Sequence, residues 1–143
     1  MNLSTSSKVT RVSNAVAAGQ ATTNCSSVDM KGFDAVTFIV SVGAIVSTGT
    51  VTVKAQQSTD DSTFADLVGT AIAFTDADDN KVAVLEITKP LERYVRAVVV
   101  TATANGTIDS VVAIQTDASE EPVTHGGTVV GAEQHLAPAE GTA

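Results

Sequence analysis

The sequence predicts an all-β protein: a single β-sandwich, jelly-roll or immunoglobulin-like in connectivity, with about eight strands and an extended C-terminal arm. Three observations lead to this fold class. Apolar residues alternate with polar ones, or run together, in short segments typical of strands. Turn-forming residues separate these segments. No window of about a dozen residues combines a 3.6-residue apolar period with helix caps, so we expect no helix.

The expected strands differ in how their apolar residues are arranged. Residues 35–42 form a continuous apolar run, typical of a strand buried in a sandwich. Residues 50–57 alternate cleanly, with Val51, Val53 and Ala55 on one side. The four phenylalanines, Phe33, Phe38, Phe64 and Phe74, are expected in the core. The complete set of expected strands is 8–16, 35–42, 50–57, 64–68, 70–74, 81–87, 93–101 and 107–115.

Three of the separators predict particular turns. Residues 58–62 carry Ser, Thr and Asp side chains that can accept hydrogen bonds from nearby backbone amides. Asn105-Gly106 predicts a type I′ hairpin, which needs positive φ at both central positions. In residues 29–34, Gly32 supplies backbone freedom for a tight turn, and Phe33 is expected to anchor the chain in the core.

The pattern divides the chain into a polar N-terminal segment (1–7), the sandwich (8–116) and the C-terminal arm (117–143). The first residues have neither the basic nor the apolar region of a signal peptide. The arm is rich in Gly, Pro, Ala and Glu, which cannot form a core. Within it, Thr128, Val129 and Val130 could add as a strand to the edge of another sheet.

Composition limits the possible partners. The chain of 143 residues has a formal net charge of −8, and its eight Lys and Arg residues are spread thinly. Nucleic acid and anionic membranes attract clustered cations, so we expect neither as a partner. Charged residues make up only 17% of the chain. This low content predicts that part of the surface is covered by another protein or by further copies of this chain.

Candidate chemical sites are few. Asp76, Asp78 and Asn80 have the spacing that begins a calcium loop, but Lys81 and Ile87 stand where such a loop needs Gly and Glu. A solvated turn is therefore favoured over a calcium site. The single cysteine, Cys25, rules out an internal disulfide.

Catalytic motifs are equally scarce. Both histidines, His125 and His135, fall in the arm, away from any rigid scaffold. We find no phosphate loop, nucleophile elbow or paired carboxylates in the sequence. We therefore expect a non-enzymatic protein without a cofactor.

One pattern suggests binding. The stretch VKAQQSTDDSTFADL, followed by LERYVRAVVVTA, is also seen in β-sandwich adhesion and carbohydrate-binding modules. Sugar sites usually display several aromatic rings, whereas this chain has a single tyrosine, Tyr94, besides its phenylalanines. We therefore interpret this pattern as an ordinary β-hairpin rather than a sugar-binding site. Arg93 and Arg96 flank Tyr94, where they could pair with acidic residues across a subunit boundary or decorate an edge.

Five segments together resemble small structural proteins of tailed bacteriophages, capsid decoration (cement) proteins among them. The segments are RVSNAVAAGQATTNCSSVDMKGFDAVTFIV, VKAQQSTDDSTFADLVGTA, LERYVRAVV, ANGTIDSVVAIQ and HLAPAEGTA, and the resemblance extends from about Arg11 to Ala143. It implies a virion protein made in the host bacterial cytoplasm. Such a protein would sit on the outer capsid surface, bind the major capsid protein and stabilise capsomer contacts.

The resemblance also implies association with itself, as a homotrimer. A head–tail connector or tail component remains an alternative, as does a carbohydrate-binding virion module. The residues expected to make assembly contacts are Arg93, Arg96, Thr128, Val129, Val130, His135 and Leu136.

Overall fold

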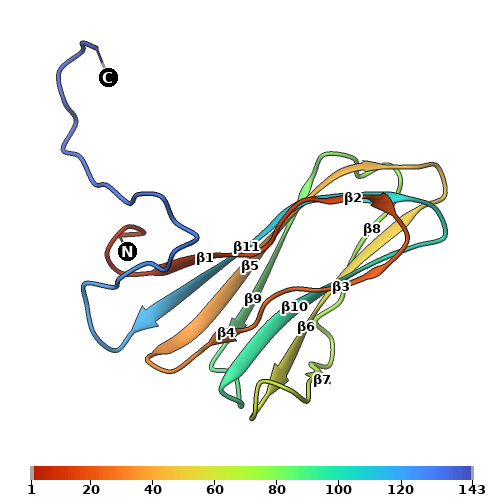
Figure 1. Cartoon of the computed structure of the whole chain (residues 1–143), viewed down its shortest axis with the longest axis horizontal. Helices are drawn as coiled ribbons and strands as arrows, with labels where there is room; N and C mark the ends of the chain where they lie inside the picture. The colour runs from red at the N-terminus through yellow and green to blue at the C-terminus, as the bar shows by residue number, and fades with distance from the viewer. Residues whose placement is uncertain (1, 143) are drawn as a thin grey trace.

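The computed structural model describes residues 2–142, which form eleven β-strands in two antiparallel sheets packed face to face (Figure 1). This confirms the predicted β-sandwich. The same residues contain no helix long and apolar enough to cross a membrane. Residues 119–142 continue beyond the last strand without regular structure, as expected of an arm.

Each sheet has two long central strands. Sheet A has the order β1-β11-β5-β9, and β2 also pairs with β11. Its strands are β1 (Lys8–Ser13), β2 (Val16–Gly19), β5 (Phe33–Ile45), β9 (Val82–Thr88) and β11 (Gly106–Ala118). Sheet B has the order β3-β10-β6-β7, with β4 also on β10 and β8 also on β6. Its strands are β3 (Thr22–Asn24), β4 (Val28–Asp29), β6 (Thr50–Ser58), β7 (Ala65–Asp66), β8 (Ile72–Phe74) and β10 (Tyr94–Ala102).

The connectivity is that of a jelly roll. Three pairs of short consecutive strands each lie along one neighbour: β1 and β2 on β11, β3 and β4 on β10, and β7 and β8 on β6. If each pair is counted as one interrupted strand, the described residues form eight strands, as predicted. The first and second of these then lie in opposite sheets. In an immunoglobulin fold the first two strands are neighbours in one sheet, so the topology excludes that alternative.

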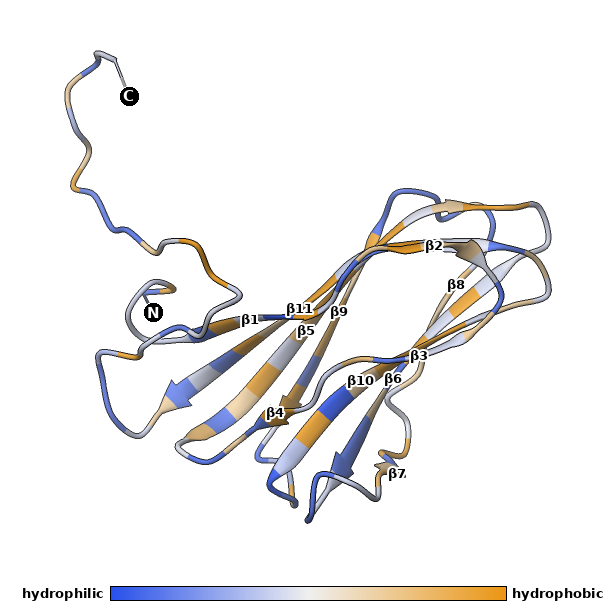
Figure 2. Cartoon of the chain, viewed as in Figure 1, coloured by the Kyte–Doolittle hydropathy of each residue, from blue (hydrophilic) through white to orange (hydrophobic). Residues whose placement is uncertain are grey.

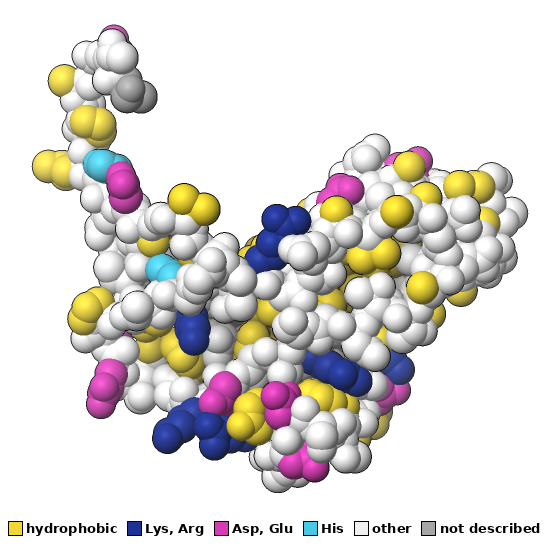
Figure 3. All heavy atoms as spheres, in the orientation of Figure 1, with side chains coloured by type: hydrophobic (Ala, Val, Ile, Leu, Met, Phe, Trp, Pro, Cys, Tyr) yellow, Lys and Arg dark blue, Asp and Glu magenta, His cyan; other side chains and the backbone are white. Residues whose placement is uncertain are grey.

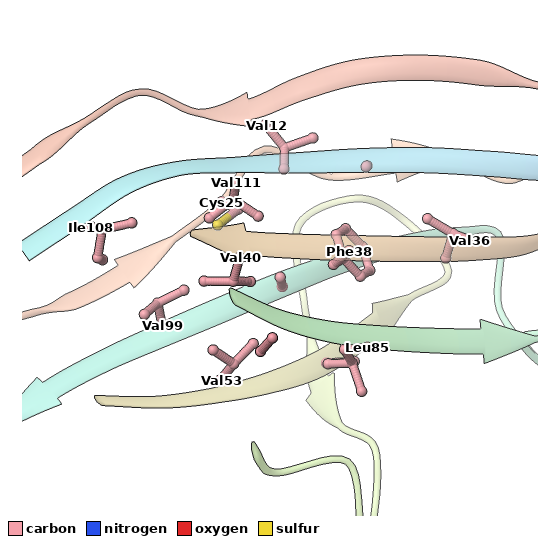
Figure 4. Packing of buried hydrophobic residues seen from close by; sticks show 14 of the residues in the cluster. Val12, Cys25, Val36, Phe38, Val40, Val53, Leu85, Val99, Ile108 and Val111 are labelled. Carbon is pink, nitrogen blue, oxygen red and sulfur yellow. The ribbon is translucent and has the colours of Figure 1, made fainter. Parts of the chain in front are cut away.

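The core lies between the sheets and is built mainly from valine. Val36, Phe38 and Val40 of β5 are fully buried and face Val53 of β6 and Val99 of β10 (Figure 4). Over the first four residues of β10, hydrophilic and hydrophobic side chains alternate, as expected for a strand with one face in the core (Figure 2).

The prediction of a type I′ hairpin at Asn105-Gly106 is wrong. The strands on either side, β10 and β11, belong to different sheets, and the positive φ falls on Thr103 (69°). Gly106 is needed for another reason. A Cβ on this residue would lie 2.9 Å from Cγ2 of Val51 and 3.4 Å from Cγ2 of Thr101, so only glycine fits where the chain crosses between the sheets.

Two other turn predictions are confirmed. In the first turn, Oδ1 of Asp60 accepts hydrogen bonds from the backbone N–H groups of Ser62 (3.0 Å) and Thr63 (2.9 Å). In the second, Gly32 has φ of 88°, and the Phe33 N–H donates to the Met30 carbonyl at 3.0 Å. Positive φ at the third position of a four-residue turn is what favours glycine there.

Several strand boundaries differ from the predictions. The segment 8–16 breaks after Ser13, and the short strands β3 and β4 were not predicted. Only Ala65–Asp66 of the segment 64–68 forms a strand. Phe64, expected in the core, instead lies half-buried on the outer surface over Arg96, whereas Phe33 packs partly buried against the core as expected.

Candidate functional site

The first part of the C-terminal arm folds back onto sheet A and onto the N-terminal segment. The Ser119 N–H donates to the Gly32 carbonyl at 2.9 Å, and the Val123 N–H donates to the Thr5 carbonyl at 2.7 Å. The amide of Asn2 in turn donates a hydrogen bond to the side chain of Gln134. Arm residues 119–134 and N-terminal residues 2–7 therefore form one connected structure, which we call the clasp.

Within the clasp, two arm side chains cover the open edge of strand β1. The Val9 N–H donates to Nδ1 of His125 at 3.1 Å, and the Arg11 N–H donates to Oγ1 of Thr128 at 3.2 Å. Unpaired amides on an edge strand can recruit a strand from another chain. These two contacts satisfy amides on the side of β1 that faces away from β11.

His125 joins three segments of the chain. Its Nδ1 accepts from Val9, and its Nε2 lies 3.1 Å from the Ser4 carbonyl oxygen. Because a carbonyl oxygen can only accept, Nε2 is the donor in this second hydrogen bond. Losing this one side chain would leave groups on both β1 and the N-terminal segment without a partner.

The structure places the predicted arm residues in two different environments. Thr128 touches β1, and Val129 lines an open hollow of about 450 Å³ together with Leu3 and Val9. Val130 and Leu136, in contrast, are almost fully exposed, at 109% and 96%. Residues 128–130 form no strand, and the arm binds β1 through side chains rather than a backbone ladder.

Beyond the clasp, residues 135–142 form a tail that projects from the body of the molecule (Figure 3). His135 contacts Glu133 at 2.8 Å, but both side chains are mostly exposed, so this contact adds little stability. The tail turns no apolar side chain into the core, and its residues are exposed throughout. Because these residues are exposed, the tail, which has one leucine and few charged residues, is accessible to a partner.

Arg93 is already paired within the chain. Its guanidinium donates two hydrogen bonds to the carboxylate of Asp29, at 2.9 and 2.7 Å. The hydrogen bond from Arg93 holds the pKa of Asp29 at about 2, below its ordinary value, and raises the pKa of Arg93. This pair ties the end of β4 to the start of β10 at one end of the sandwich.

Arg96 belongs to a polar network on the outer face of sheet B. Its guanidinium lies over the ring of Phe64 at 3.9 Å and donates to Oε1 of Gln56 at 2.9 Å. The Gln56 amide donates to Asp66, which also receives Nζ of Lys54 at 2.8 Å. The predicted role of either arginine across a subunit boundary stays a prediction, since both make these contacts within one chain.

The calcium candidates lie in the loop between β8 and β9, where each has a contact within the chain. Asp78 accepts from the Thr75 N–H (2.9 Å) and from Nζ of Lys81 (2.7 Å), and the hydrogen bond from Lys81 lowers its pKa to about 2. Asp76 accepts from the Thr48 N–H, and the Asn80 N–H donates to the Gly43 carbonyl. Over residues 2–142, no three His, Cys, Asp or Glu side chains are grouped so that they could hold a metal ion.

Cys25 is the chain's one thiol, and it is 4% exposed within the core. Burial raises its pKa to about 11, against the smaller opposing effect of Arg96. Nucleophilic chemistry uses the thiolate, which this environment disfavours. The structure therefore gives Cys25 a packing role between the sheets (Figure 4).

The contribution of His125 and of the N-terminal segment was not predicted from the sequence. His125 was expected to be an ordinary arm residue, yet it binds β1. No local pattern could have identified it, because the edge position of β1 depends on its pairing with β11, about a hundred residues away.

No protein-family model matches this chain, and no curated protein matches its sequence.

Proposed function

We propose that this chain is a non-enzymatic structural protein of a tailed-phage particle, a capsid decoration protein that binds the outer shell. The proposal starts from the resemblance of its sequence segments to such proteins. It is supported by an acidic net charge of −8, which suits a surface remote from packaged DNA. It is also supported by a sandwich in which Asp60, Asp78 and His125 make hydrogen bonds within the chain and Cys25 is buried in the core.

One observation carries the proposal furthest: the clasp holds the root of the arm, while residues 135–142 extend outward with Leu136 exposed. Because the clasp holds residues 119–134 on the sandwich, the tail leaves the body at a fixed point. This lowers the conformational entropy that the tail loses when it binds a partner. We assign residues 135–142 as the segment that attaches the protein to the major capsid protein. The sandwich would then lie on the outer surface of the shell, next to the point where the tail is attached.

The experiment that tests this function is a count of copies in purified phage particles by quantitative mass spectrometry. We expect a copy number comparable to that of the major capsid protein, or a simple fraction of it. A handful of copies per particle would instead support the head–tail connector or tail role. Absence from particles would overturn the virion proposal.

A further inference from the structure

The two hydrogen bonds of the His125 ring run in opposite directions. The Val9 N–H donates to Nδ1 at 3.1 Å, so this nitrogen accepts, whereas Nε2 donates to the Ser4 carbonyl at 3.1 Å. A protonated imidazole has a hydrogen on both nitrogens and cannot accept. His125 can therefore hold Val9 only while its Nδ1 carries no proton, and its bond to Ser4 is compatible with either form of the ring.

The Val9 amide depends on this bond. Val9 lies opposite Ile114 of β11, but its N–H is directed away from β11 and towards the arm. In an antiparallel ladder only every second residue donates to a given neighbour, so β11 does not satisfy this amide. A proton on Nδ1 would set one N–H against another and leave the Val9 amide without a partner.

Few charged groups face this histidine from the elements packed against it. The N-terminal part of the clasp contains no charged side chain, and β1 carries two cations, Lys8 and Arg11. In the arm, Glu133 lines the same open hollow as the histidine, but it already contacts His135 at 2.8 Å. The cations of β1 oppose a further positive charge beside this strand, so the closed clasp disfavours a protonated ring.

We propose that the clasp is a pH-sensitive switch, in which a proton taken up by Nδ1 of His125 releases the arm from the edge of β1. The open clasp has a place for this proton and the closed clasp has none. Protons therefore favour the open state, so the clasp is closed at high pH and opens as the pH falls. The change belongs between about pH 5 and 8, where histidine is the one ordinary side chain that changes its charge.

The opening separates the arm from β1 without taking the clasp apart. The N-terminal segment and the arm lie side by side next to β1 (Figure 1), and the bond from Val123 to the Thr5 carbonyl involves no titrating group. Thr128, which accepts from the Arg11 N–H, follows His125 by three residues and should leave β1 with it. Acid then exposes the outward amides of β1, the kind of open edge to which another strand can be added.

Hydrogen exchange of single amides, followed by NMR between pH 5 and 8, tests the switch. After correction for the pH dependence of the chemical exchange step, protection of Val9 and Arg11 should be constant above about pH 7. It should fall by up to about tenfold for each pH unit below about 6, as expected for the uptake of one proton. Protection of Val123 in the clasp and of Val40 in β5 should not change.

His125→Gln is the decisive variant, because its amide cannot take up a proton in this range. Whether the Gln side chain replaces the ring well or poorly, protection of Val9 should no longer vary with pH. His135→Gln is the matched control on the exposed tail and should keep the pH dependence of the unmodified chain. The midpoint at which the His125 ring resonances titrate should coincide with the loss of Val9 protection.

Three results would overturn the switch: Val9 protection that ignores pH in the unmodified chain, an unchanged pH dependence in His125→Gln, or its loss in His135→Gln. A loss of protection confined to Val9, with Arg11 unaffected, would equally show that the arm stays on β1. The measurement uses the isolated chain and goes beyond the proposed function. A clasp that ignores pH would therefore leave the capsid role standing.

Discussion

Nδ1 of His125 accepts a hydrogen bond from the Val9 backbone N–H at 3.1 Å, joining the C-terminal arm to the edge strand of sheet A. The two residues are separated by almost the whole sandwich in sequence. This bond makes the root of the arm part of the fold and leaves only the tail beyond Gln134 projecting. The division at 117 predicted from the sequence therefore lies earlier than the point at which the arm leaves the body.

Replacing His125 should open the clasp without unfolding the sandwich. In His125→Ala, the Val9 N–H and the Ser4 carbonyl lose their partner, which should lower the free energy of unfolding by about 1 kcal/mol. Hydrogen exchange at Val9 should accelerate far more than exchange in β5. The matched control is His135→Ala on the exposed tail, and equal exchange in both variants would contradict this role for His125.

The ion pair between Asp29 and Arg93 should make the free energy of unfolding depend on pH in the acidic range. The hydrogen bond from Arg93 holds the pKa of Asp29 at about 2 in the folded protein, below its ordinary value of 3.8. The unfolded state therefore binds the proton more readily, so this stabilisation is present above about pH 4 and is lost as the pH falls through about 2.

Asp29→Asn should accordingly be less stable than the original protein at pH 7, and the difference should shrink as the pH approaches 2. Urea denaturation at a series of pH values measures both effects. Asp34→Asn, on the exposed start of β5, is the control and should change stability little. A difference for Asp29→Asn that does not vary with pH would show that the ion pair does not cause it.

Gly106 should tolerate no side chain. In Gly106→Ala the new Cβ would lie 2.9 Å from the Val51 side chain, and we expect a loss of about 1–3 kcal/mol in the free energy of unfolding. Gly126→Ala serves as the control, because a Cβ there has no atom within 4 Å. Chemical denaturation of the two variants compares them directly, and equal stabilities would disprove the close approach.

The thiol of Cys25 should be unreactive in the native protein. It is 4% exposed, and its pKa is raised to about 11 by burial. An alkylating reagent at pH 8 should therefore modify it only as fast as the sandwich opens, and rapidly once urea unfolds the chain. Fast modification in native buffer would mean that the core near Cys25 is open to solvent.

The sequence patterns predicted the faces of the strands better than their partners. Alternation has a period of two along a strand, so the buried positions Val51, Val53 and Ala55 of β6 could be predicted from local residues alone. Pairing is set by contacts distant in sequence, such as Val9 with Ile114 in sheet A. For this reason the sequence left the jelly-roll and immunoglobulin-like connectivities open, and the strand order decides between them.

The wrong predictions share the same cause. An Asn-Gly turn closes a hairpin only if its flanking strands pair with each other, but β10 pairs with β6 and β11 with β5. Phe64 was expected in the core because it is apolar, but it follows a turn that places it over Arg96 on the outer face. The clasp could not be predicted because side-chain bonds to an edge strand leave no periodic pattern.

The measurement that tests the central claim most directly is the binding of a truncated chain to capsids that lack this protein. Truncation after Gln134 removes the tail but keeps His125 and Thr128 on β1, so the fold and melting temperature should not change. If residues 135–142 attach the protein to the shell, occupancy of the capsids should fall by at least about tenfold relative to the full chain. Occupancy equal to that of the full chain would contradict the account.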